Sequence, residues 1–223
     1  MSAATDSLTV PFRNNALVVN ATFALLLGTL FFLMGRAGVF ALFGVPVLVI
    51  LAPWFLKYCL VVGQQAAYGR REPPNLSLDN LNPLEIQPIA LILGLIGLGA
   101  LLAFVLGPAA ATLGLALVTP AAIAVLVVEE RAIDALNPVT LVRYAAGLGP
   151  LYPLLVVVPG VALWLCILAL GSGLGMLLTV FVLQSVLIAT FHGIGQLLHA
   201  RENAIGYGRP EIAEAIAEQA REL

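Results

Sequence analysis

One stretch near the middle of the chain, EERAIDALNPVTLVR (Glu129 to Arg143), restricts the fold more than any other feature. It places five charged side chains between long runs of apolar residues. Charged groups are costly in a lipid interior, whereas runs of about 20 apolar residues fit it well. The pattern therefore predicts an integral membrane protein in which polar islands separate helical membrane spans.

The composition supports the same class. Hydrophobic residues make up 61% of the 223 residues and charged residues 10%, against about 45–50% and about 25% in soluble domains. A soluble core of this size cannot bury such an excess, so we expect membrane lipids around the chain. Only ten Lys and Arg residues and a net charge of -2 leave no basic surface for nucleic acid.

Six stretches are long and apolar enough to span a bilayer once the long runs are divided at Gly, Pro and Arg. We predict an all-α polytopic bundle of three helical hairpins. The third and fourth spans meet at Gly107-Pro108, which demands a very tight turn; if that hairpin does not cross fully, it becomes a re-entrant pair. The expected spans are 16–34, 39–62, 89–106, 109–128, 148–170 and 174–198.

The basic residues predict the orientation, because short loops rich in Lys and Arg stay in the cytoplasm. In a six-span arrangement eight arginines fall on one side and only Arg36 falls on the other. Lys57 lies near the end of the second span that faces the arginine-rich side. Both termini are then cytoplasmic. So are the segment 1–15, the connectors 63–88 and 129–147, and the tail 199–223, which contains a short amphipathic helix from Pro210.

The two connectors contain similar sequences, LDNLNPLEI (Leu78 to Ile86) and IDALNPVTL (Ile133 to Leu141). The match indicates either an internal repeat or a chance recurrence of Asn-Pro, which is also a common turn. In either case Asn-Pro favours a helix start, because Asn caps free N–H groups and Pro lacks one. We expect a short interfacial helix over 132–136 and a second one after Asn137, with a plain surface loop as the alternative. Their apolar residues, Ile133, Leu136, Val139 and Leu141, would face the acyl chains.

Because all charge except Arg36 lies on this side, we interpret the connectors as an interaction face for a protein partner or lipid headgroups. Its candidate residues are Arg70, Arg71, Asp79, Asn82, Glu129, Glu130, Arg131, Asp134, Asn137 and Arg143.

Polar residues recur at helical spacing along the last span, so they share a face. Such a face indicates either a transport pathway or hydrogen bonding between helices, and for Gln184 we expect a bond to a neighbouring helix. Prolines also interrupt spans two, four and five, and interrupted helices of this kind form substrate sites in transporters. However, no acidic residue lies beside them to hold a cation. The polar face comprises Gln184, Ser185, His192, Gln196 and His199; the prolines are Pro46, Pro53, Pro120, Pro153 and Pro159.

The sequence contains none of the zinc-protease, nucleophile-elbow or phosphate-loop patterns that mark common enzymes. We predict no catalytic residue, no cofactor and no metal site. Cys59 and Cys166 both fall within spans, where thiols usually act as small buried hydrophobes. Oligomeric state stays open.

Three stretches resemble a known family: Thr119 to Leu155, Pro73-Pro74 after Tyr68-Gly69-Arg70, and Phe191 to Ile212. They resemble polytopic inner-membrane proteins of Proteobacteria that share a domain of unknown function. That domain is loosely similar to the membrane domain beside some glycerophosphodiester phosphodiesterases. The resemblance implies a bacterial inner membrane and brings no activity or residue role with it. The resulting hypothesis is a structural or accessory membrane protein, with a small-solute or lipid transporter as the alternative.

Overall fold

The computed structural model describes residues 3–36, 38–70, 72–74, 86–171 and 175–205. Within these ranges every regular element is a helix, so the all-α prediction is confirmed. The long helices are α2 (Asn14–Arg36), α3 (Gly38–Ala67), α4 (Ile86–Leu106), α5 (Pro108–Glu129), α7 (Tyr152–Gly171) and α8 (Met176–Ala200). The short ones are α1 (Ala3–Thr9), η1 (Val10–Phe12), η3 (Asp134–Leu136), α6 (Pro138–Leu148), η4 (Gly149–Leu151) and α9 (Glu202–Ile205).

Six stretches in the described part are long and apolar enough to cross a membrane, which confirms a multi-pass membrane protein. Four of them agree with the expected spans to within three residues, whereas the second, Gly44–Ala67, is displaced by five residues from 39–62. The fifth runs over Pro138–Cys166 and combines α6, η4 and most of α7. The chain turns at Gly149, whose φ of +66° suits glycine, so α7 itself begins only at Tyr152.

The hairpin between α4 and α5 turns on a single residue, as the sequence predicted. Gly107 has a φ of +89°, and Pro108 begins α5 at once. Glycine tolerates this backbone conformation, and proline fits the first helical position because it has no N–H to satisfy. The two helices then pack along each other.

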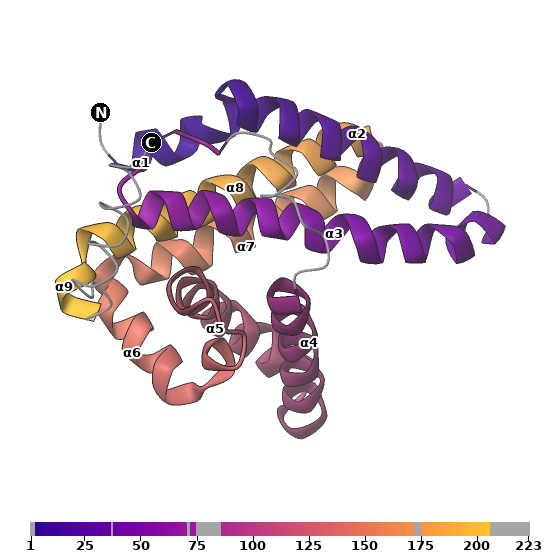
Figure 1. Cartoon of the computed structure of the whole chain (residues 1–223). Coiled ribbons are helices and arrows are strands. Elements are labelled where there is room, and N and C mark those ends of the chain that lie inside the picture. Colours follow the sequence, from indigo (N-terminus) through magenta and orange to yellow (C-terminus); the bar gives the residue numbers. More distant parts are fainter. Residues whose placement is uncertain (1–2, 37, 71, 75–85, 172–174, 206–223) are drawn as a thin grey trace.

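The bundle has a compact side and an open side. On the compact side α2, α3 and α8 pack together, and the second half of α5, from Pro120 to Val127, is buried among α3, α6, α7 and α8. On the open side α4 touches mainly α5 and runs across the direction of α3 (Figure 1). Phe104 of α4 is 91% exposed, and such an apolar surface fits lipid rather than water.

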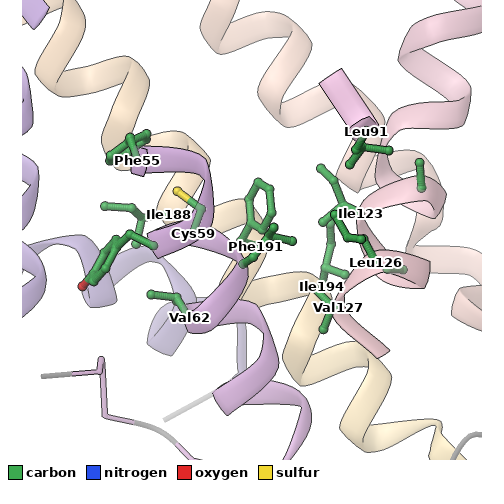
Figure 2. Packing of buried hydrophobic residues seen from close by; sticks show 14 of the residues in the cluster. Phe55, Cys59, Val62, Leu91, Ile123, Leu126, Val127, Ile188, Phe191 and Ile194 are labelled. Atoms are coloured by element: carbon green, nitrogen blue, oxygen red, sulfur yellow. The ribbon is translucent and has the colours of Figure 1, made fainter. Parts of the chain in front are cut away.

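Helices α3 and α8 approach each other closely at two glycines, Gly63 and Gly195. A Cβ atom added to Gly195 would overlap the carbonyl oxygen of Gly63 and lie 2.7 Å from the Cβ of Ala66. Small residues permit such backbone contact in membrane proteins. Figure 2 shows the apolar packing around it, with Cys59 and Val62 of α3 near Ile188 and Phe191 of α8, and with Ile194 beside α5.

The structure also corrects details of the spans. Pro153 is the second residue of α7, where it breaks no intrahelical hydrogen bond, whereas Pro46, Pro53, Pro120 and Pro159 lie inside continuous helices. In α6 the side chain of Leu141 is buried against protein and does not face acyl chains. The expected tail helix from Pro210 lies outside the described residues.

Candidate functional site

We use the term connector face for the end of the molecule where α3 and α5 finish and α4 begins. Arg70, Glu130 and Arg131 are exposed there, and Asp134 opens η3. Asn137 caps α6 as predicted, because its Oδ1 accepts the Val139 N–H at 3.0 Å. Arg71, Asp79 and Asn82 lie outside the described residues.

Glu129 joins the end of α5 to α6. Its Oε1 accepts a hydrogen bond from the Tyr144 hydroxyl at 2.9 Å and lies 3.5 Å from Nη2 of Arg143. The Arg143 guanidinium also stacks over the Tyr144 ring, 5.3 Å from its centroid. Because both ion-pair partners are partly exposed, the pair itself is weak. This group positions α6, and its carboxylate is already engaged.

A small, open cleft lies on the connector face between α3, α4 and α5. Its polar wall combines a cation, two amides and a carboxylate: Lys57, Gln64, Gln87 and Glu130. Its apolar wall consists of Leu60, Val61, Pro88 and Leu126. Both signs of charge and an apolar floor therefore meet in one small space.

Backbone and side chains hold the polar wall in place. Glu130 adopts a left-handed conformation with a φ of +54° where α5 ends, and its Oε1 accepts from Nε2 of Gln64 at 3.1 Å. Oε1 of Gln87 accepts a hydrogen bond from the Ala132 N–H at 2.8 Å, which links α4 to the connector 129–147. In each amide one atom is engaged in these bonds, so the remaining atoms, Nε2 of Gln87 and Oε1 of Gln64, are held in defined positions.

The polar face of α8 contacts the N-terminal segment. Ser185 accepts a hydrogen bond from Nδ2 of Asn20 at 2.7 Å, and Nδ1 of His192 lies 3.1 Å from the Ser7 hydroxyl. Gln196 donates from Nε2 to Asp6 at 3.0 Å. These bonds seat α1 and the start of α2 on α8. His199 lies against Gly69, where an added Cβ would be 3.1 Å from the ring.

Asp6 closes this contact with an ion pair to Arg13. The hydrogen bond and the charge of Arg13 hold the pKa of Asp6 below its ordinary value of 3.8, although burial opposes the shift. The carboxylate therefore stays ionised at neutral pH between Arg13 and Gln196.

Gln184 differs from the rest of the face. Its side chain is buried, and neither Oε1 nor Nε2 has a hydrogen-bond partner among the described residues. The expected bond to a neighbouring helix is not found.

Comparisons with protein-family models, curated proteins and solved structures found no match to this chain. The resemblance to proteobacterial inner-membrane proteins thus stays a prediction.

Several residues of these sites escaped the sequence analysis. Gln64, Gln87 and the buried pair Asp6 and Ser7 lie in segments whose polarity looked ordinary. Only Lys57 gave a signal, as a single cation inside an otherwise apolar span. The structure brings Glu130 into the cleft but gives Glu129 and Arg143 a bracing role.

Proposed function

We propose that the protein is a non-enzymatic accessory protein of the bacterial inner membrane whose connector face binds a phospholipid headgroup. The cleft between α3, α4 and α5 carries this proposal, because it combines opposite charges with an apolar floor.

The position of the cleft along the membrane spans suits a headgroup. It lies where α4 begins at Ile86 and α5 ends at Glu129, so it is level with the ends of two candidate membrane spans. Headgroups occupy this level of a bilayer, directly above the hydrocarbon core. Leu60 and Val61 on the apolar wall would contact the first acyl carbons.

The charges favour a zwitterionic headgroup over a purely anionic one. Lys57 supplies a compact positive charge of the kind that binds phosphate. Glu130, oriented by Gln64, supplies a carboxylate for an ammonium group. A headgroup that carries a phosphate and a primary amine, as phosphatidylethanolamine does, satisfies both.

Native mass spectrometry tests this directly. The protein would be reconstituted with equal amounts of phosphatidylethanolamine and phosphatidylglycerol, and retained lipids would be recorded after mild detergent release. We expect wild type to retain phosphatidylethanolamine, Lys57→Gln to lose it, and Glu130→Gln to shift retention towards phosphatidylglycerol. Arg131→Gln is the matched control, because Arg131 is exposed on the same face but does not line the cleft. Equal retention in wild type and Lys57→Gln would rule the site out.

Transport of a small neutral solute is the second candidate, and the unpartnered amide of Gln184 favours it. It requires flux in proteoliposomes that is lost in Gln184→Ala or His192→Ala. Flux that persists in both variants would remove the polar face of α8 from consideration.

A further inference from the structure

Six buried polar side-chain atoms have no hydrogen-bond partner among the described residues. One is Nε2 of His192, eight residues beyond Gln184 along α8 and therefore about 12 Å nearer the connector face. The other five lie deeper in the bundle. They are Oδ1 of Asn20, Nε1 of Trp54, the Tyr58 hydroxyl, and both Oε1 and Nε2 of Gln184. The side chains of Asn20, Tyr58 and Gln184 are at most 3% exposed. These four residues come from α2, α3 and α8, the three helices of the compact side.

The residues of α2 and α3 that carry these atoms lie within about 6 Å of one another along the bundle axis. Phe23 packs edge-on against Trp54, with ring centroids 5.7 Å apart. From that contact, Asn20 is three residues towards the connector face along α2 and Tyr58 is four residues in the same direction along α3. These steps are rises of about 4.5 Å and about 6 Å, so Asn20 and Tyr58 are nearly level.

Helix α8 contributes Gln184 at the same level. Phe191 lies beside Gly63, since a Cβ on Gly63 would be 3.2 Å from the Phe191 carbonyl oxygen. Both helices run towards the connector face, so seven residues back along each leads to Gln184 on α8 and Leu56 on α3. Leu56 lies between Trp54 and Tyr58. Nδ2 of Asn20 also donates a hydrogen bond to Ser185, the neighbour of Gln184, at 2.7 Å, which places Asn20 of α2 beside this part of α8.

Buried polar groups in proteins are almost always hydrogen-bonded, to protein or to an ordered solute, and a membrane offers no other partner. Five such atoms in one layer, both donors and acceptors, indicate an occupant that bonds to them. We propose that the layer formed by Asn20, Trp54, Tyr58 and Gln184 is a buried binding site for water or another small neutral solute with both donor and acceptor groups. This site is independent of the headgroup cleft.

The occupant is neutral because the layer contains amide, indole and hydroxyl groups and no charged side chain. Lys57 is the neighbour of Tyr58 in sequence but lines the cleft against α4 and α5, on another face of α3. An ion would lose its hydration here without an opposite charge in compensation.

Cysteine labelling tests whether solute reaches the layer. Thiols react with methyl methanethiosulfonate only as thiolates, which form in hydrated surroundings and not in apolar ones. We expect Gln184→Cys to be labelled at least about tenfold faster than Val182→Cys, whose position on the same helix faces outwards. The unmodified protein gives the background, since Cys59 and Cys166 are both buried. Equal labelling of the two variants overturns the proposal.

A stability measurement provides the second test. Gln184→Met keeps the length of the side chain but removes its amide. If the layer is dry, removing two unpartnered atoms raises the melting temperature; if the amide bonds a bound solute, the substitution lowers it. We expect a lower melting temperature, and a higher one overturns the proposal. Direct bonding among the side chains predicts a lower melting temperature with slow labelling, so the two measurements together exclude it.

Discussion

The contact between α3 and α8 gives the sharpest prediction for stability. In Gly195→Ala the new methyl group would overlap the Gly63 carbonyl oxygen and lie 3.0 Å from the Ala67 backbone nitrogen. These neighbours are backbone atoms, so the strain cannot be relieved by a side-chain rotation and the helices must separate. Overpacking of a core typically costs about 1–3 kcal/mol, and backbone neighbours place this substitution at the upper limit, about 3 kcal/mol.

Two other glycines provide a graded comparison. A Cβ on Gly63 would lie 3.1 Å from Cγ2 of Val127 and 3.2 Å from the Phe191 carbonyl oxygen, so Gly63→Ala should cost less. A Cβ on Gly97 of α4 meets nothing within 4 Å, and alanine favours a helix over glycine by about 1 kcal/mol. Gly97→Ala should therefore be neutral or stabilising.

The assay is the free energy of unfolding, measured by titration with sodium dodecyl sulfate in mixed micelles. We expect Gly97→Ala to be the most stable of the three variants, Gly63→Ala to be intermediate and Gly195→Ala to be the least stable. If Gly195→Ala unfolds at the same free energy as Gly97→Ala, the close approach of α3 and α8 is wrong.

Two further contacts predict measurable effects. Because the pKa of Asp6 is lowered when folded, its ion pair stabilises the α1 contact above pH 3.8 and is lost as pH falls below that value. Amide-exchange protection of residues 3–12 should therefore drop in acid in wild type, while Asp6→Asn should show low protection at neutral pH already; unchanged protection in the variant would contradict this. Removing the cap of α6 by Asn137→Ala should cost about 1 kcal/mol of unfolding free energy, measured in the same titration, whereas Asn137→Ser should retain most of the stability. Equal losses in both variants would show that the cap contributes nothing.

The spans and the local helix starts could be predicted because each depends on residues close in sequence. A bilayer demands about 20 apolar residues in a row, and that demand is visible without any knowledge of packing. The turn at Gly107 and the cap at Asn137 are equally local, since each depends on the backbone properties of one or two residues.

The pairing of helices could not be predicted in the same way. The bonds from α1 to α8 join residues 185 to 190 positions apart, and nothing in the spacing of Asp6 or Ser7 identifies His192 and Gln196 as partners. Likewise, nothing in the sequence around Gly195 identifies Gly63 of α3 as its neighbour. By contrast, a Cβ on Gly175, the residue before α8, would meet nothing within 4 Å. Small residues permit close packing without specifying which helix approaches.

Helix α3 separates the two proposed sites. Successive residues on a helix point about 100° apart, so Lys57 and its neighbour Tyr58 reach different surroundings. Lys57 lines the cleft against α4 and α5, whereas Tyr58 belongs to the buried layer with Asn20 and Gln184. The two sites should therefore respond separately to substitution: Lys57→Gln should release lipid without slowing the labelling of Gln184→Cys, and Gln184→Met should lower stability without changing lipid retention. A change in both properties from either substitution would mean that α3 couples the cleft to the layer, since α3 is the one helix that lines both.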